Sequence, residues 1–403
     1  MPNRRALAFI FCTVVLDCLA LGLMLPVLPV LVLGFTGGDT ARAAEAFGVF
    51  ATAWGLMQVL FSPLLGALSD SYGRRPVILI SCLGLGLDYV FMALAPSLAL
   101  LFVGRVISGI TAATISTSFA YIADVSEPDQ RARSFGLVGV GFGLGFVLGP
   151  AIGGLLGGLD PRLPFWVAAG ASLLNAAFGW FVLPESLPPE KRVPFAWRRA
   201  NPLGALRLLA SRRGLVGLST VDFLGNVAHQ VLPSVFVLYA GHRYGWNETT
   251  VGLTLALVGI GSAIVQGLLV GPVVRRLGAR RALLTGIAFG IAGMTVYGLA
   301  PTGGLFWLGV PVMSVWGISG PALMEMMSRR VGPSEQGQLQ GAGSSLRSLT
   351  GLVGPGLFTV TFATFIGPLP GAPFLLAALI LLLNLGVAAV VTRHDAWQDV
   401  TKS

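Results

Sequence analysis

Long uninterrupted apolar runs, rather than alternating apolar and polar positions, dominate the chain. About 20 consecutive apolar residues form a helix long enough to cross the ~30 Å hydrocarbon core of a bilayer. Four runs without a charged residue reach that length: 46–69, 134–159, 163–184 and 249–274. Four more are equally apolar but carry one or two ionisable residues each: 6–33, 76–95, 98–124 and 214–240. The pattern therefore predicts membrane-spanning helices.

Two further uncharged runs are too long for one span each. The run 282–324 is divided by the turn-forming sequence Pro-Thr-Gly-Gly at 301–304, and the run 348–392 by Gly-Pro-Leu-Pro-Gly at 367–371. The total is twelve spans, and an even number places both termini on the same side of the membrane. We expect an all-α integral membrane protein of twelve transmembrane helices.

The composition excludes the other main classes of protein. Of the 403 residues, 54% are hydrophobic and 11% are charged, and the mean hydropathy is +0.81. A soluble domain carries roughly 25% charged residues, and a disordered chain needs far fewer apolar ones. A transmembrane β-barrel consists of roughly 10-residue segments of alternating hydrophobicity, which this chain lacks. A helical membrane bundle remains.

The basic residues predict the orientation of this bundle. Of 26 Lys and Arg residues, 22 fall in segments that the predicted topology places on one side. The other side receives Arg42, Arg162 and Arg243, while Arg105 lies inside a span. Because basic residues are enriched in cytoplasmic loops, we expect an inner-membrane protein with both termini in the cytoplasm. The net charge of +9 then reflects topology and favours contact with membrane lipids; no basic folded domain is present to bind nucleic acid.

An internal repeat organises the chain. A shift of 205 residues aligns Asp17 with Asp222, and Gly149-Pro150 with Gly354-Pro355. The same shift also aligns a second group of residues, Gly66, Gly73 and Arg75, with Gly271, Gly278 and Arg280. The repeat predicts two six-helix halves of like orientation, 1–183 and 214–403, joined by a cytoplasmic linker at 184–213. Transporters built from repeats bind their substrate near the membrane midplane.

Nothing in the sequence calls for a cofactor or a metal. A pump driven by ATP would need a phosphate-binding loop with a lysine, and neither Lys191 nor Lys402 lies in one. Cys12, Cys18 and Cys82 fall within spans, where thiols behave as small hydrophobic groups. Any active transport must therefore draw on an ion gradient.

Several motifs resemble those of a known family. The segment 66–76, Gly-Ala-Leu-Ser-Asp-Ser-Tyr-Gly-Arg-Arg-Pro, resembles the signature of the major facilitator superfamily between its second and third helices. Arg105 and Gly109 after Leu101 resemble its fourth-helix motif, and 145–154 resembles the fifth-helix motif of antiporters. A further set resembles the tetracycline/proton antiporters in particular: Asp17, Gly22, Pro26, Pro29, Asp88-Tyr89 and 121–124. The resemblance implies a major facilitator fold and proton-coupled drug export.

Two positions depart from the tetracycline antiporters. Where those proteins carry an acidic residue in the ninth helix, this chain has Gly290, and where many carry a histidine in the eighth helix it has Ser262. Both positions bear on binding of a metal–tetracycline complex. We therefore expect tetracycline to be a poor substrate of this protein.

Ionisable residues at membrane depth are the first candidates for proton coupling or substrate binding, because placing a charge there costs about 2.5–3.5 kcal/mol even on insertion scales. Asp17 and Asp88 lie inside the first and third spans, and Arg105 in the fourth is a natural counter-charge. The alternative interpretation is a static buried ion pair.

A second group lies on the seventh span. Asp222, Asn226 and His229 are spaced i, i+4 and i+7, so they share one face of a helix. A polar face on a membrane helix favours the wall of a cavity. His229 titrates near neutral pH in the ordinary case, although a lone histidine also serves as a hydrogen-bonding partner for a neighbouring helix.

The loop between the second and third spans supplies candidate gating residues. The resemblance implies that Asp70 meets the N-terminus of the eleventh helix as a latch, with Arg74 and Arg75 kept cytoplasmic. Asp124, at the end of the fourth span, is either a gate charge or part of a solvated cluster. Ordinary topogenic charge in a turn is the alternative for the loop as a whole.

Small residues recur every four positions along the fifth span. Gly145, Gly149 and Gly153 form a stripe that lets helices approach closely in lipid, and Pro150 predicts a kink. The pattern is typical of close packing, and we also expect it to contribute to alternating access.

Together these features predict a transporter, not an enzyme, that exports a small amphipathic compound in exchange for protons. We expect a monomer whose partners are that substrate, protons and membrane lipids. A proton-coupled importer or facilitator of a natural solute is the first alternative, and the direction of substrate flux in vesicles separates the two. A membrane receptor or enzyme is disfavoured, since no nucleophile–base or metal constellation is present in the sequence.

Overall fold

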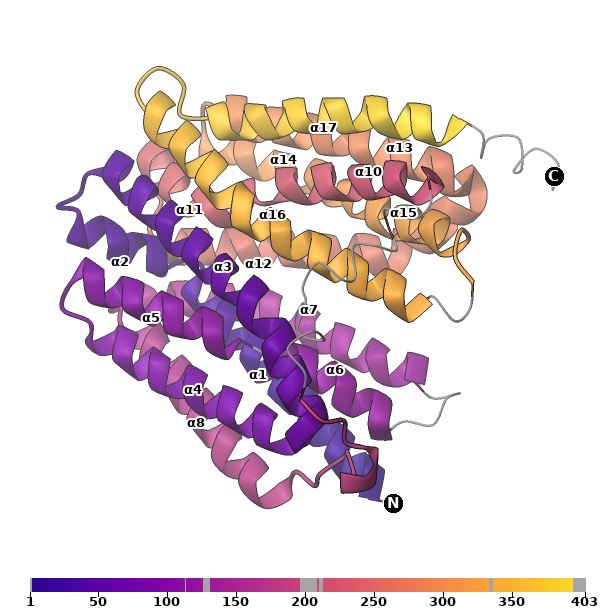
Figure 1. Cartoon of the computed structure of the whole chain (residues 1–403). Coiled ribbons are helices and arrows are strands. Elements are labelled where there is room, and N and C mark those ends of the chain that lie inside the picture. The colour runs from indigo at the N-terminus through magenta and orange to yellow at the C-terminus, as the bar shows by residue number, and fades with distance from the viewer. Residues whose placement is uncertain are drawn as a thin grey trace. The chain divides into compact units, whose positions relative to one another are not determined.

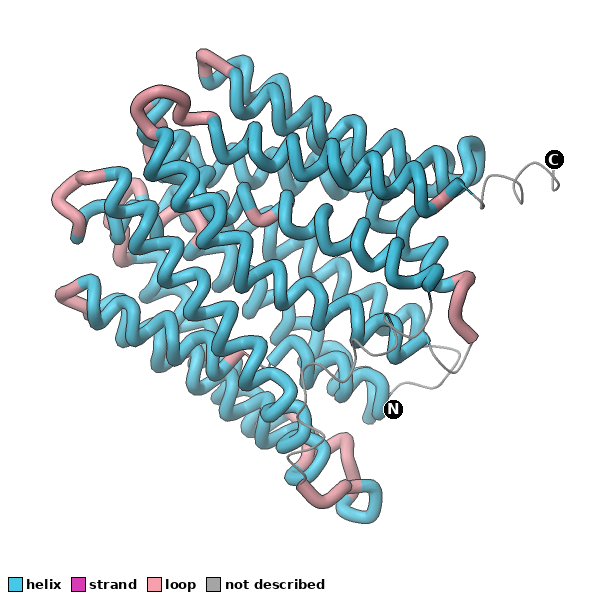
Figure 2. Tube along the Cα trace, turned by 45° about the horizontal axis from the view of Figure 1, so that its top comes forward, coloured by secondary structure: helices cyan, strands magenta, loops and turns pink. Residues whose placement is uncertain are grey.

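A computed structural model describes residues 2–112, 114–125, 131–195, 209, 213–332 and 336–393. All regular secondary structure in these residues is helical, and short loops connect the helices (Figure 2). The N-terminal helices are α1 (Pro2–Met24), α2 (Leu28–Phe35), α3 (Thr40–Tyr72), α4 (Arg74–Leu94), α5 (Leu98–Thr111), α6 (Thr114–Val125), α7 (Arg131–Gly157) and α8 (Leu163–Val182), followed by a 3-10 turn, η1 (Pro189–Lys191).

The helices of the second part of the chain are shown with those of the first in Figure 1. They are α10 (Arg213–His229), α11 (Val231–Tyr244), α12 (Glu248–Ile264), the π-helical turn η2 (Val265–Leu269), α13 (Val270–Leu299), α14 (Gly303–Val315), the 3-10 turn η3 (Trp316–Ile318), α15 (Ser319–Ser328), α16 (Gln336–Phe365) and α17 (Ala372–Val391). Of the expected linker 184–213, residues 196–208 and 210–212 lie outside the described residues.

Eleven helical segments among the described residues are long and apolar enough to cross a membrane. The prediction of a multi-pass helical membrane protein is therefore confirmed. One of the eleven, Glu248–Leu299, has 52 residues, which at about 1.5 Å per residue is far longer than a ~30 Å hydrocarbon core. Inside it Gly278 has φ 75° and ψ 157°, a non-helical conformation that breaks the segment in two.

Contacts between Cα atoms divide the chain into two compact units. Unit 1 comprises Met1–Asp39, Phe50–Pro202 and Trp246–Ala256, and unit 2 comprises Thr40–Val49, Leu203–Gly245 and Leu257–Ser403. Within unit 1, α1 packs along α7 and α4 packs along α8. Within unit 2, α17 packs against α10 and α13 (Figure 1).

The glycine stripe of α7 packs closely against α1 in unit 1. A Cβ atom built on Gly149 would lie 2.7 Å from the Cα atom of Gly22 on α1. Gly145 faces Cys18 and Gly153 faces Leu23 in the same way, so the two backbones touch. Because the hydrophobic effect does not drive helices together in lipid, the van der Waals contacts of this close backbone approach stabilise the helix pair instead.

Helix interruptions fall at corresponding positions of the 205-residue repeat. The regular α-helix is interrupted between Met24 and Leu28, and again at Gln230 between α10 and α11. The second pair consists of the end of α5 at Thr111 and the turn η3. A proline follows three of these four breaks: Pro29, Pro233 and Pro321. Each lies in the first turn of the next helix, where proline is tolerated, whereas it disfavours a continuous helix.

Candidate functional site

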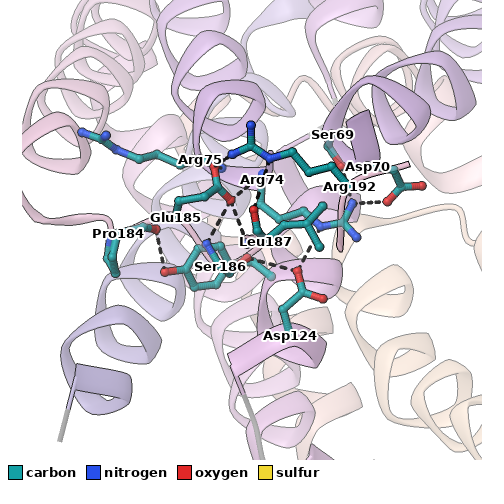
Figure 3. A network of polar contacts seen from close by, with 11 residues as sticks. Ser69, Asp70, Arg74, Arg75, Asp124, Pro184, Glu185, Ser186, Leu187 and Arg192 are labelled. Atoms are coloured by element: carbon teal, nitrogen blue, oxygen red, sulfur yellow. Dashed lines mark hydrogen bonds and ion pairs between the residues drawn. The ribbon is translucent and has the colours of Figure 1, made fainter. Parts of the chain in front are cut away.

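A polar cluster joins the loop between α3 and α4 to the residues that follow α8, all within unit 1 (Figure 3). We call it the loop cluster; it consists of Ser69, Asp70, Arg74, Arg75, Asp124, Glu185, Ser186 and Arg192. Gly73 forms the turn with φ 110°, a value that favours glycine. A Cβ atom on Gly73 would also lie 2.8 Å from the carboxyl carbon of Glu185.

Glu185 is the centre of the loop cluster. Its carboxylate accepts the backbone N–H of Arg74 at 2.9 Å and that of Arg75 at 3.3 Å, the first two residues of α4. It also accepts the backbone N–H groups of Ser186 and Leu187 at 2.9 and 3.0 Å. A residue more than one hundred positions away thus caps α4, and the favourable helix dipole adds to the hydrogen bonds.

Arg74 connects two of the predicted gating carboxylates. It forms an ion pair with Asp70, and its Nε lies 3.1 Å from Oδ2 of Asp124. Ser186 donates a hydrogen bond to that same oxygen at 3.1 Å. Arg75 points elsewhere: its Nη2 donates to the carbonyl of Trp180 at 2.6 Å, and its guanidinium lies 5.9 Å from the centre of the Trp180 ring. The structure thus brings the side chains of Asp70, Arg74 and Asp124 together, whereas Arg75 joins the cluster only through its backbone N–H.

The chain after α8 is fixed along the end of α3 by further backbone contacts. Val193 donates its N–H to the carbonyl of Asp70 at 3.2 Å, and its own carbonyl accepts the Ser71 hydroxyl at 2.8 Å. Arg192 lies 3.9 Å from Glu185. The described start of the predicted linker is therefore part of unit 1 rather than a free connection.

We expect Glu185→Ala to lower the melting temperature of the purified protein in detergent. The substitution leaves four backbone N–H groups without their acceptor, and an unsatisfied buried donor costs about 1–3 kcal/mol. Glu190→Ala is the matched control, since Glu190 is exposed in the same segment. Equal melting temperatures for the two variants would show that the cap contributes nothing.

Three charged residues are buried inside the helices of unit 1. Asp17 on α1 is 5% exposed, Asp88 on α4 is 2% and Arg105 on α5 is 9%. Among the described residues, both carboxylate oxygens of Asp88 and Oδ1 of Asp17 have no hydrogen-bonding partner. Arg105 interacts electrostatically with Asp88, and its guanidinium lies 5.2 Å from the centre of the Trp54 ring. Asp88 and Arg105 therefore lie near each other, but Asp88 makes no hydrogen bond to Arg105.

A small cavity of about 40 Å³ adjoins Asp17 in unit 1. Its wall includes Leu21, Trp54, Tyr89 and Thr114. Asp88 and Arg105 are not part of this wall. We call it the unit-1 cavity.

Unit 2 holds a larger cavity of about 340 Å³, which we call the unit-2 cavity. Asp222, Asn226 and His229, from one face of α10, all line it. The Nδ2 of Asn226 donates to Oδ1 of Asp222 at 2.9 Å, while Oδ2 of Asp222 has no hydrogen-bonding partner among the described residues. The His229 ring lies 5.6 Å from that of Trp316.

The two cavities are built on corresponding positions of the repeat. Five pairs of residues related by the 205-residue shift line the two cavities: Asp17 and Asp222, Leu21 and Asn226, Ser108 and Met313, Ala112 and Gly317, and Thr114 and Ser319. The unit-1 cavity is narrowed by Trp54 and Tyr89. Their repeat counterparts, the smaller Gly259 and Met294, are not among the residues that line the unit-2 cavity.

Several lining residues of the unit-2 cavity are not predicted as functional from the sequence, among them Ser262, Gln266, Trp316 and Asn384. The sequence marks Ser262 only as a departure from the tetracycline antiporters. Asn384 is the one strongly polar side chain in α17, and a lone amide in so apolar a helix was the signal that could have identified it.

Gly290 lies behind the cavity wall rather than in it. A Cβ atom on Gly290 would lie 2.9 Å from Cγ of Trp316 and 3.1 Å from Cδ1 of Leu381. The absence of a side chain at this position leaves the space that the Trp316 indole occupies. An acidic residue at position 290 would displace that indole.

Glu325, on α15, forms an ion pair with Arg329 one turn later and does not line the unit-2 cavity. No group of three or more His, Cys, Asp or Glu suited to a metal ion occurs within the described part of the chain.

Comparison with known proteins agrees with this architecture. A sequence profile described as Major Facilitator Superfamily matches residues 10–355. The chain belongs to the major facilitator superfamily. It is similar to the tetracycline resistance protein, class C, of Escherichia coli, with 38% identity over 406 residues that cover 100% of both chains. The sequence-based assignment to the branch that resembles tetracycline/proton antiporters is therefore confirmed, and the protein is a transporter rather than an enzyme.

Two solved structures extend the comparison within the superfamily. The human organic anion transporter MFSD10 (TETRAN) has a TM-score of 0.72 and 26% identity, and the match covers 96% of this chain and 100% of that one. A bacterial homologue of the human lysosomal transporter Spinster has a TM-score of 0.77 at 17% identity, covering 98% and 97% of the two chains. The second likeness shows the fold alone.

Proposed function

We propose that this superfamily member is a proton-coupled antiporter that exports a small amphipathic compound across the bacterial inner membrane by alternating access. The observation that carries the proposal is an aspartate at the same repeat position in each unit, the buried Asp17 and the half-buried Asp222, each in the wall of a cavity. A buried carboxylate of this kind exchanges a proton for a substrate group. The similarity to a tetracycline resistance protein supports export as the direction.

The proposed topology has twelve spans in two six-helix halves. The break at Gly278 supports two spans within Glu248–Leu299. The halves then run from 1 to 183 and from 214 to 403. The distribution of basic residues supports a cytoplasmic location for both termini and for the 184–213 segment.

In the proposed mechanism, Asp17 and Asp88 carry the proton or contact a cationic substrate group. Arg105, which interacts electrostatically with Asp88, tunes the exchange. Asp222, Asn226 and His229 provide the corresponding surface in unit 2.

The proposed gating elements are the loop cluster and the glycine stripe of α7. The contacts of Arg74 with Asp70 and Asp124 support a role for this loop in holding one conformation. A latch between Asp70 and the start of the eleventh helix remains a prediction from the family resemblance. Gly145, Gly149, Gly153 and Pro150 would let α7 shift along α1 during the transport cycle.

Expression in an efflux-deficient bacterium tests the proposed function. We expect resistance to at least one amphipathic antibiotic from a panel, and proton release from acidified everted vesicles when that compound is added. Collapse of the proton gradient should abolish its accumulation in the vesicles. Unchanged susceptibility to every compound, together with no substrate-dependent proton flux, would refute the proposal. Uptake into right-side-out vesicles would favour the importer instead.

Tetracycline itself is expected to be a poor substrate. A metal–tetracycline complex presents a hard cation that favours oxygen ligands, whereas the Trp316 indole fills the space beside Gly290 and Ser262 replaces the expected histidine. One lost hydrogen-bonding partner costs about 1–3 kcal/mol. The measurement is tetracycline susceptibility beside an empty vector and the class C protein of Escherichia coli. Resistance equal to that of the class C protein would show that the two departures do not matter.

A further inference from the structure

We propose that the unit-2 cavity binds the protonated amine of an amphipathic substrate, with Asp222 and Asn384 accepting its N–H groups and Trp316 packing against its apolar part. This inference rests on the proposed function, export of a small amphipathic compound, and names the substrate class of that site.

Two acceptor oxygens at the cavity lack a donor. Oδ1 of Asp222 accepts a hydrogen bond from Asn226, whereas Oδ2 is buried and has no hydrogen-bonding partner among the described residues. Asn384 is 2% exposed, lines the same cavity, and its Oδ1 is likewise without a partner within the described chain. Leaving a buried polar atom unpaired is unfavourable. An ammonium group has three N–H donors and no acceptor, so it complements this pair of oxygens.

The charge of the cavity wall favours a cation. Among the described residues that line the cavity, Asp222 is the only carboxylate and none is a lysine or arginine. His229 is the other titratable group among these described lining residues. Arg347 on α16 interacts electrostatically with Asp222 from outside the wall, and its Nη2 donates to Ser344 at 3.2 Å. An anionic substrate would therefore be repelled by the Asp222 carboxylate, and no described lining residue would supply a lysine or arginine to attract it.

An aromatic wall completes the proposed site. The Trp316 indole lines the cavity beside His229, and the missing side chain at Gly290 makes room for it. A cation near the face of a tryptophan is attracted by the ring, and the ring also buries apolar substrate surface. The volume of about 340 Å³ falls within the range of roughly 300–1,000 Å³ that small-molecule sites occupy.

Three probes of matched shape test this inference on the purified full chain in detergent at pH 7. They are 4-phenylbutylamine, 4-phenylbutan-1-ol and 4-phenylbutyrate, which differ in charge and hydrogen-bonding group. Equilibrium dialysis of each radiolabelled probe should show saturable binding of the amine, at least tenfold tighter than the alcohol, and none of the carboxylate. This comparison uses the unaltered protein, so it does not depend on a variant that folds.

Asp222→Asn should weaken binding of the amine at least tenfold and change binding of the alcohol by less than about twofold. Asn384→Ala should weaken the amine severalfold. Glu325→Gln is the matched control, because it removes a carboxylate of unit 2 that does not line the cavity, and it should leave all three affinities unchanged.

Equal binding of the three probes, tighter binding of the carboxylate, or no saturable binding of the amine would each overturn the inference. The measurement with 4-phenylbutyrate is informative because one similar solved structure is named an organic anion transporter. An unaltered amine affinity in Asp222→Asn would overturn it as well. Failure of the proposed function would look different: the amine preference would persist while no proton-driven export occurred.

Discussion

Replacing Asp17 by Asn is expected to abolish proton-driven export and to leave the protein folded in the membrane. Asp17 is 5% exposed and lines the unit-1 cavity, and its Oδ1 has no hydrogen-bonding partner among the described residues. Asparagine has nearly the same volume, so the helix contacts of α1 are retained. It carries no exchangeable acidic proton, so substrate movement can no longer be coupled to the gradient.

The measurement is substrate-induced proton flux in everted vesicles, normalised to the amount of folded protein in the membrane. We expect a loss of at least a hundredfold. Asp160→Asn serves as the control, because Asp160 lies in an exposed loop between α7 and α8 and is outside the unit-1 cavity wall. Proton-driven accumulation that persists in Asp17→Asn would remove this residue from the coupling mechanism.

Gly149→Leu is expected to prevent unit 1 from folding correctly. A Cβ atom at position 149 already falls 2.7 Å from the Cα atom of Gly22 and 2.8 Å from the Leu19 carbonyl oxygen. Both are backbone atoms, so no side chain can rotate away to make room. Overpacking of an interior usually costs about 1–3 kcal/mol, and we expect a loss at the upper end or beyond, since α1 and α7 must separate.

Gly143→Leu gives a matched comparison on the same helix. A Cβ atom on Gly143 has no heavy atom within 4 Å, so the same substitution meets open space there. Size-exclusion chromatography in detergent should give a monodisperse peak for Gly143→Leu and a reduced or aggregated one for Gly149→Leu. Equal yields and melting temperatures would mean that the α1–α7 contact is not required for folding.

The class of protein followed from local features of the sequence. Apolar runs long enough to cross a bilayer predict spanning helices wherever they occur, since satisfying the backbone in lipid leaves few alternatives. The spacing of Asp222, Asn226 and His229 placed them on one helix face because helical periodicity is a local property. Family motifs at 66–76 and 145–154 were continuous segments and could be read directly.

Contacts between segments that are distant in the chain could not be predicted in this way, because no local sequence pattern marks them. Glu185 caps α4 from 111 positions away, and before the structure it was only part of a predicted linker. Asn384 and Trp316 meet α10 at one cavity although each lies on a different helix. The sequence suggested Arg105 as a counter-charge, but it could not indicate that the Asp88 carboxylate has no hydrogen-bonding partner among the described residues.

The sequence by itself thus determined that the chain is a helical membrane transporter, and its repeat related Asp17 to Asp222. The tertiary structure decided which residues surround each aspartate, how large each cavity is and why position 290 has no side chain. The physical reason is that spanning helices are specified by the solvent that they cross. Cavities depend instead on how side chains from several helices fill the space between them, and that filling is known only once the helices are packed.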